Sequence, residues 1–178
     1  MLRAARGRVC RFGYGETMDT ILPDADERAL RALAVGYATS VDRRDVDGFV
    51  GVFSPEGVLR VFDAGVHDEP RTILRGSTQL ARVIERISAY EATFHFIGQA
   101  SYTADGVDGA TGEVYCTARH LTRTADGATD FTMLIRYGDR YERLADGWRI
   151  ADRAVVVDWT ADQPAVPPTV GPPKRTSS

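Results

Sequence analysis

The stretch YATSVDRRDVDGFVGVFSPEGVL, residues 37–59, predicts two helices that meet at a tight break and lead into a strand. The first helix carries its apolar side chains at helical spacing, at Leu30, Leu33, Ala34, Tyr37, Ala38 and Val41. DRRD at 42–45 interrupts this period, and Asp45 stands where the N-cap of the next helix is expected. SPEG at 54–57 then predicts a turn, and VLRVFDAG at 58–65 a short strand.

After this stretch, the hydrophobic residues first recur at helical spacing again, and from about residue 94 they alternate as in β-strands. Residues 75–90 predict a third helix with Ser77 as its cap, while Asp24 or Asp26 can cap the first helix. Gly- and Asp-rich turns then separate strands predicted at about 94–104, 111–123, 130–143 and 148–158. Helices followed by a strand meander predict an α+β fold, a curved antiparallel sheet with helices packed on one face.

Length and composition indicate one ordinary globular domain. The chain has 178 residues, of which 43% are hydrophobic and 26% charged. Residues 1–22 are predicted to be a disordered extension and residues 162–178 a flexible Pro-rich tail, which leaves 23–161 as the folded unit.

Charge and cysteine usage exclude several classes of function. The net charge of −3 argues against a nucleic-acid partner, and no apolar run is long enough to span a membrane. Cys10 and Cys116 do not form a disulfide framework, so we expect free thiols in a reducing cytoplasm. No close-spaced ligand pattern indicates a metal site, and no cofactor is expected.

Alternation along the strands predicts which polar side chains face the core. His120 shares the apolar face of its strand with Val114, Cys116 and Ala118. Arg153 falls in line with Ala151, Val155, Val157 and Trp159. A buried arginine must be paired or must meet an anionic ligand, because an unpaired buried charge is very costly.

Asp42 and His95 complete a candidate catalytic set with Tyr37, His120 and Arg153. Asp42 closes the first helix, at the end where the macrodipole disfavours a carboxylate, which indicates a role other than helix stability. His95 takes an inward position in TFHFIGQ, residues 93–99. A hydrogen-bonded Asp fixes the tautomer of a His and raises its basicity. Each residue also has a structural reading: His95 satisfied by backbone, Tyr37 in the core, Arg153 paired with a core acid.

Residues 25–160 resemble the SnoaL-like group of the nuclear-transport-factor and ketosteroid-isomerase superfamily. The residues that carry the resemblance are the opening stretch and the order of helices before a meander. More narrowly, the chain is similar to scytalone dehydratase and its relatives, which include a bile-acid dehydratase and a dehydrochlorinase. The resemblance implies a cone-shaped (cystatin-like) sheet with three N-terminal helices on its concave face.

The resemblance also implies roles for single residues. SVDRRD and HFIG resemble the segments that hold the catalytic aspartate and histidine, which places these roles on Asp42 and His95. ARH places the second histidine at His120. Tyr37 and Arg153 match residues used by relatives. The pattern departs where Val41 stands in place of a tyrosine, and where LRVF offers Phe62 in place of another.

Together these features predict a cofactor-independent lyase of the dehydratase kind, acting on a small apolar oxygenated ring compound such as a polyketide, terpenoid or steroid-like intermediate. His95 would act as the base and Asp42 would orient it. His120 or Tyr37 would act as the acid, and Arg153 would hold developing negative charge. The expected pocket-lining residues are Phe53, Phe62, Cys116 and Trp159. The alternatives are a cyclase or double-bond isomerase with the same pocket, and a non-catalytic small-molecule-binding module. A homodimer or homotrimer is expected.

Overall fold

The computed structural model describes residues 21–66 and 68–166. The predicted N-terminal extension and Pro-rich tail, and Cys10 with them, therefore lie almost wholly outside the described residues. The chain order of elements is α1 (Asp24–Arg43), α2 (Val46–Gly51), β1 (Phe53–Phe62), β2 (Thr72–Arg75), α3 (Gly76–Ile87), β3 (Ala92–Ala104), β4 (Gly109–Thr124), β5 (Gly127–Leu144) and β6 (Gly147–Ala165).

The strands form one six-stranded sheet in the order β2-β1-β6-β5-β4-β3. β3 to β6 are the predicted antiparallel meander, although β6 continues to Ala165, into the segment predicted as tail. β1 pairs antiparallel with β2 and parallel with β6, so the sheet is mixed and the prediction of an antiparallel sheet was wrong at this edge. The short strand β2 was not predicted.

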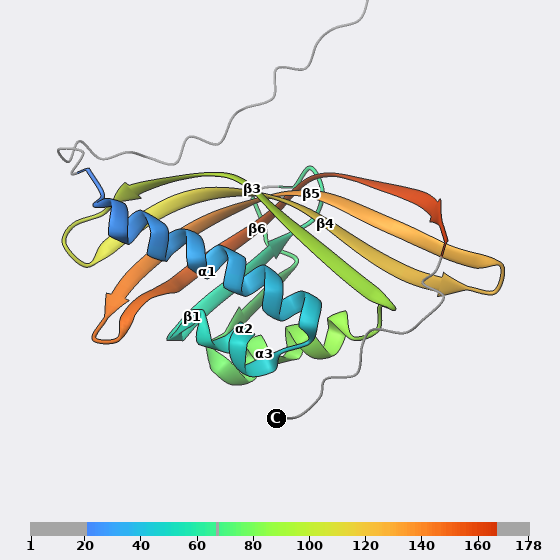
Figure 1. Cartoon of the computed structure of the whole chain (residues 1–178), viewed down its shortest axis with the longest axis horizontal. Coiled ribbons are helices and arrows are strands. Elements are labelled where there is room, and N and C mark those ends of the chain that lie inside the picture. Colours follow the sequence, from blue (N-terminus) through green and yellow to red (C-terminus); the bar gives the residue numbers. More distant parts are fainter. Residues whose placement is uncertain (1–20, 67, 167–178) are drawn as a thin grey trace, which may run out of the picture.

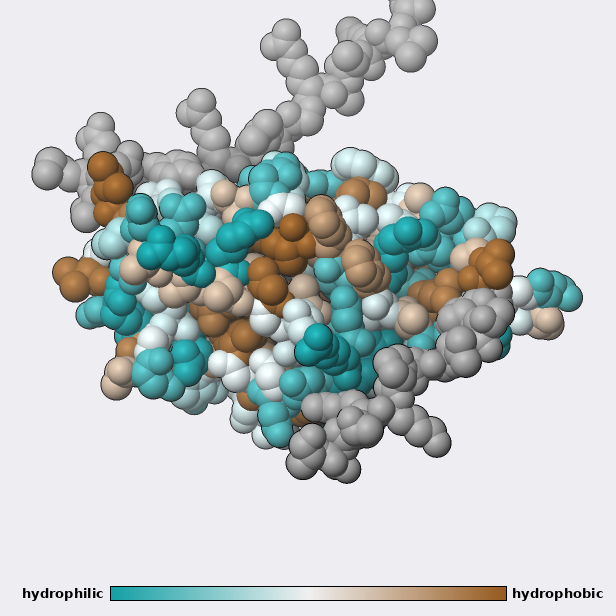
Figure 2. All heavy atoms as spheres, in the orientation of Figure 1, coloured by the Kyte–Doolittle hydropathy of each residue, from teal (hydrophilic) through white to brown (hydrophobic). Residues whose placement is uncertain are grey.

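The sheet curves over the helices, which all lie on its concave side (Figure 1). α1 runs along β3 and β6, and α3 packs against β1. The α+β class and the curved sheet with helices on one face are thereby confirmed. On the face shown in Figure 2, hydrophobic side chains reach the surface in small groups among hydrophilic ones.

The core lies between α1 and the concave face. The predicted stripe on α1 is buried at Leu30, Ala34, Tyr37, Ala38 and Val41, and Leu33 packs against its edge. The sheet meets this stripe with alternate residues of its strands, among them Leu59, Val114, Tyr137, Ile150 and Val157. An amphipathic helix on an alternating sheet is what the two hydrophobic periods require.

The helix ends follow the predictions only in part. Asp45 caps α2 as expected, and its side chain accepts from the Gly48 backbone N–H at 3.1 Å. α1 and α3 have no side-chain cap, so the predicted caps at Asp24, Asp26 and Ser77 were wrong. In Asp26 the reason is competition, because its carboxylate accepts instead from Arg143 and Trp148 at the far end of the sheet.

No helix in the described part of the chain combines the length and hydrophobicity needed to cross a bilayer.

Candidate active site

The structure brings Asp42 and His95 into direct contact. Asp42 lies in the last turn of α1, and His95 lies on β3. Nδ1 of His95 is 2.7 Å from Oδ1 of Asp42, and the His95 backbone N–H donates to Oδ2 at 2.9 Å. The Thr93 hydroxyl also donates to Oδ1, at 3.0 Å. The carboxylate at the unfavourable end of the helix is thus held by donors from the neighbouring strand.

This contact sets the ionisation of Asp42 and the orientation of the His95 ring. Burial acts to raise the pKa of Asp42, but the hydrogen bonds from His95 and Thr93 outweigh it and lower the pKa. An ionised carboxylate only accepts, so the proton on the bonded edge of the ring sits on Nδ1 and Nε2 is left as the acceptor. The side chain of His95 is 6% exposed and that of Asp42 23%, so solvent reaches the edge of the pair.

His120 lies beside His95, with its ring centroid 5.6 Å away, and packs against Tyr90 at 4.4 Å. It is 5% exposed, and neither ring nitrogen has a hydrogen-bond partner among the described residues. Burial, followed by the electrostatic effects of His95 and Arg44, lowers the pKa of His120 to about 4. His120 is therefore a neutral imidazole with two unused hydrogen-bonding atoms, a costly arrangement that a bound polar group would relieve.

Arg153 and Tyr37 belong to a second cluster. The guanidinium of Arg153 donates to Asp139 at 2.8 and 2.7 Å, and Tyr141 donates its hydroxyl to the same carboxylate at 2.6 Å. The rings of Tyr37 and Tyr137 lie 4.4 and 4.3 Å from the guanidinium carbon. The structural alternative for Arg153 is the one observed, and its partner acid is Asp139.

The strand register separates the two clusters. His95 is paired with Ala118 of β4, whereas the Arg153–Asp139 pair stands level with Gly112. Six residues of β strand correspond to about 20 Å along the chain. The five candidate residues therefore divide into Asp42, His95 and His120 at one level of the concave face, and Tyr37 and Arg153 at another.

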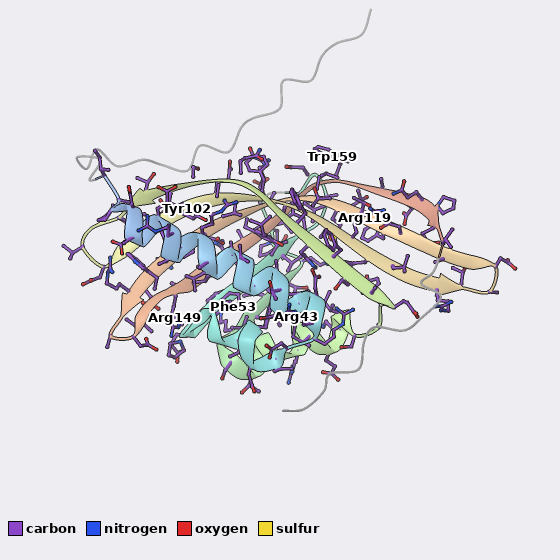
Figure 3. The ribbon with its side chains drawn as sticks, in the orientation of Figure 1. Arg43, Phe53, Tyr102, Arg119, Arg149 and Trp159 are labelled. Carbon is purple, nitrogen blue, oxygen red and sulfur yellow. The ribbon has the colours of Figure 1, made fainter. Side chains whose placement is uncertain are left out.

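Cys116 lies on β4 between these two levels. It is buried on the concave face, as predicted from alternation. Burial raises the pKa of its thiol to about 11, although a hydrogen bond with Tyr137 acts in the opposite direction. Phe53, also predicted to line the pocket, is buried in the core, with its ring 6.1 Å from Tyr37 and 5.6 Å from Phe49. Figure 3 shows it below α1.

Trp159 does not face the pocket, and that prediction was wrong. The pairing of β5 with β6 passes from Ile135–Val157 to Leu134–Trp159, so Asp158 is one extra residue in β6. Such a bulge shifts the alternation by one position. Trp159 consequently lies on the convex face and is 60% exposed (Figure 3).

Phe62 was also wrongly predicted as a pocket residue. It pairs with Val156, whose neighbour on β5 is Arg136 on the convex face. The adjacent Val61, paired with Val155, is the residue that packs against the core. Phe94 and Phe96 flank His95 on the convex side and are 61% and 63% exposed.

Three further residues touch the site and were missed. Thr93 contacts Asp42, Tyr90 packs on His120, and Arg44 donates to Thr93 at 2.6 Å. Thr93 could have been found, because it lies two residues before His95 and therefore on the same face. Arg44 and Tyr90 carry no such signal, since both lie outside the strands.

Two hollows in the surface lie away from these clusters. One of about 360 Å³ lies at the β4–β5 hairpin and the end of β6, and one of about 250 Å³ lies at the start of α1. Neither is lined by a residue of the two clusters. Within residues 21–66 and 68–166, no three His, Cys, Asp or Glu side chains are placed to hold a metal ion.

A curved sheet with helices on its concave side and an Asp42–His95 contact on that side defines the class of the protein as α+β. A family model described as a SnoaL-like domain matches residues 25–154. The chain belongs to the SnoaL-like family, as its motifs indicated. No curated protein sequence matches the chain.

Several solved structures share the fold. One is a scytalone dehydratase-like protein from Novosphingobium aromaticivorans, with 16% identity, a TM-score of 0.67, and coverage of 86% of this chain and 96% of that one. Another is the hexachlorocyclohexane dehydrochlorinase LinA-type3 from Novosphingobium barchaimii, with 15% identity, a TM-score of 0.67, and coverage of 81% and 96%. A protein of unknown function from Nostoc punctiforme, with 22% identity, a TM-score of 0.58, and coverage of 83% and 98%, has a cystatin-like fold. These likenesses confirm the cystatin-like fold.

Proposed function

We propose that the protein is a cofactor-independent lyase of the dehydratase kind, with Asp42 and His95 as its acid–base pair. The observation that carries the proposal is the 2.7 Å contact between Oδ1 of Asp42 and Nδ1 of His95. Membership of the SnoaL-like family supports it, as do two structural neighbours named for eliminations, a dehydratase and a dehydrochlorinase.

The proposed reaction removes water from a small, mostly apolar ring compound that carries a carbonyl and a hydroxyl group. Nε2 of His95 takes the proton next to the carbonyl, and Asp42 stabilises the imidazolium that forms. The same proton then passes to the departing hydroxyl, which leaves as water while the C–O bond electrons remain with the oxygen. The electrons of the broken C–H bond form the new double bond, and His95 returns to its starting state.

His120 is proposed to bind the hydroxyl group of the substrate rather than to supply a proton as a cation. With its pKa lowered to about 4, its ring is neutral at physiological pH and offers one donor and one acceptor. Both atoms are buried and unpartnered in the described structure. A substrate hydroxyl would satisfy one of them and be oriented toward His95.

Tyr37 and Arg153 have no part in the proposed proton transfers. Burial raises the pKa of Tyr37 to about 12, and its ring lies against the Arg153 guanidinium. Arg153 is already paired with Asp139. We propose that both residues shape the concave face beyond the reacting groups.

The test is turnover of a panel of cyclic β-hydroxy ketones, followed by the loss of one water from the product mass. His95→Gln and Asp42→Asn should each lower kcat by roughly 10²–10⁴-fold. Asp158→Asn, the same chemical change on the convex face, serves as the matched control and should leave kcat unchanged. Rates like wild type in both site variants would refute the pair as the acid–base machinery.

An isomerase or cyclase is the second candidate, and family membership together with a single proton-shuttling His95 favours it. An isomerase returns the proton to another carbon, and an aldol-type cyclase passes it to the oxygen of the attacked carbonyl, so in both cases the product mass equals the substrate mass. A small-molecule-binding module without catalysis is the non-enzymatic alternative. In that case ligands would bind, and His95→Gln would change affinity with no product formed.

A further inference from the structure

Arg44 links the end of α1 to both histidine-bearing parts of the site. It is the residue after α1 and, among the described residues, the single non-glycine with a positive φ, 58°. Its Nη1 donates to the Val41 carbonyl at 2.8 Å and to the Thr93 hydroxyl at 2.6 Å. Its Nη2 donates to the carbonyl of Tyr90 at 3.4 Å, and Tyr90 is the residue packed on His120.

These contacts give the Thr93 hydroxyl a direction. A hydroxyl has one proton, and a guanidinium can only donate. Because Arg44 donates to the oxygen of Thr93, the one proton of Thr93 is free to go to Asp42, whose Oδ1 lies 3.0 Å away. Asp42 is then held by Thr93 and by the ring and backbone N–H groups of His95, three donors from one strand.

Arg44 also places a permanent positive charge near His120. The groups near His120 are the rings of Tyr90 and His95, the cation Arg44 and the carboxylate of Asp42, while Asp130 acts from the convex face of the sheet. The carboxylates favour a proton on His120, while burial, the charge of Arg44 and a protonated His95 oppose it. An arginine does not lose its proton in a protein, so its contribution persists at every pH of interest.

We propose that Arg44 and Thr93 are positioning residues. They hold Asp42 against His95, and they make His95 rather than His120 the ring that accepts the proton taken from the substrate. The inference rests on the proposed function, since it names two residues that prepare the same pair. Without Arg44, the Thr93 hydroxyl can turn away from Asp42, and His120 loses a cationic neighbour. Both changes weaken the division of roles between the two rings.

The experiment follows the imidazole rings directly by NMR, which requires no substrate. The chain has 3 His residues, so His95→Gln and His120→Gln assign the signals. Arg44→Met should raise the titration midpoint of His120 by about one pH unit, the size expected from a nearby like charge. Arg44→Lys should restore most of the wild-type midpoint because it restores the charge.

Thr93 is tested with a pair of nearly isosteric variants. Thr93→Val removes the hydroxyl and should move the resonance of the His95 Nδ1 proton that bonds Asp42, while Thr93→Ser should keep that resonance in place. Arg43→Met is the matched control for Arg44, because Arg43 is the exposed neighbouring arginine at the end of α1 (Figure 3). It should leave both histidine signals unchanged.

A second variant guards against loss of the fold. Arg44→Gly suits the positive φ of this position and removes the same charge, so it should reproduce the His120 shift in a protein that still unfolds cooperatively. An unmoved His120 midpoint in Arg44→Gly, or identical Nδ1 proton signals in Thr93→Val and Thr93→Ser, would overturn the proposal.

Kinetics distinguish failure of this inference from failure of the proposed function. With a turned-over substrate, Thr93→Val should lower kcat several-fold with KM unchanged, and Thr93→Ser should recover it. If His95→Gln retains full activity but the NMR shifts occur, the positioning stands and the catalytic assignment falls. If His95→Gln is inactive but the shifts are missing, the reverse holds.

Discussion

Arg153 on β6 and Asp139 on β5 stand directly opposite each other and form a two-bond ion pair with no exposed side-chain surface. The rings of Tyr37 and Tyr137 both pack against the guanidinium, and burial lowers the pKa of Arg153, but Asp139 together with Tyr141 and Tyr37 outweighs burial and raises it. The charge is therefore kept inside the core by its partner. Breaking the pair and replacing it are expected to have very different effects.

Asp139→Asn should lower the free energy of unfolding by about 3–5 kcal/mol, because it leaves a buried guanidinium without its counter-charge. The double variant Asp139→Leu with Arg153→Met should be markedly less destabilised than that single variant. Chemical denaturation of the variants measures both. Arg60→Met, which breaks the half-exposed pair with Asp152, is the control and should cost about 1 kcal/mol or less. If Asp139→Asn also lowered the free energy of unfolding by only about 1 kcal/mol or less, this account would be contradicted.

Stability should fall as the pH drops from about 6.5 to about 4, because of His120. An unfolded His has a pKa of about 6.5, whereas that of folded His120 is lowered to about 4. Between these values the unfolded chain binds the extra proton, so the free energy of unfolding decreases with falling pH, by up to roughly 3 kcal/mol. Asp42, with its lowered pKa, adds its own loss only below its ordinary value of 3.8.

Urea denaturation across this range, compared with His120→Gln, isolates the contribution of His120. The variant should show a flatter dependence on pH between the two values and the same acid loss below them. Parallel curves for the two proteins would show that His120 titrates normally in the folded state.

The thiol of Cys116 should be unreactive in the folded protein. It is buried, and its pKa is raised to about 11, so the thiolate that reacts with alkylating agents is scarce near neutral pH. In a Cys10→Ser background, we expect mass spectrometry to find alkylation of Cys116 only after unfolding in urea. Rapid labelling of the native protein would mean that the concave face opens around β4.

The predicted homodimer or homotrimer stays a prediction, and the convex face is where we expect it to form. Phe94, Phe96 and Trp159 project from this face, and aromatic side chains are enriched in interfaces. Two arginines of this face are neutralised within it, because Arg119 pairs with Asp130 and Arg136 pairs with Asp158. A second copy would therefore meet little repulsion.

Trp159→Glu should shift the protein toward monomer in sedimentation velocity, because it places a charge in the aromatic group. Val107→Glu, at an exposed apolar residue in the β3–β4 turn, should leave the distribution unchanged. A wild-type protein that is monomeric at every concentration would remove the basis of this prediction.

The change from helical to alternating period predicted most of the fold, since each period matches one kind of packing surface. The contact of Asp42 with His95 followed from the family resemblance, because two residues so far apart in the chain share no local signal. The position of Thr93 could have been predicted from the same strand alternation that placed His95 on the inner face.

Other features depend on strand pairing and contacts that the local sequence does not predict. The extra residue at Asp158 turns Trp159 outward, and nothing in the local sequence marks it. In FHF at 94–96, alternation separates the histidine from the two phenylalanines, but composition alone would turn the phenylalanines inward. The left-handed conformation of Arg44 belongs to the C-terminal cap of α1, where its backbone N–H donates to the Val41 carbonyl, and no glycine or asparagine marks this position.

The parallel pairing of β1 with β6 has a consequence for how the chain assembles. Leu59 stands beside Arg153, so the inner edge of β1 has no strand to bond until the end of the described chain has been synthesised. Pairings of such long sequence separation are closed late and slow folding. A ribosome-bound chain that lacks β6 would hold the β1–β2 hairpin with one bare edge, an exposed template for chaperones or for other nascent chains.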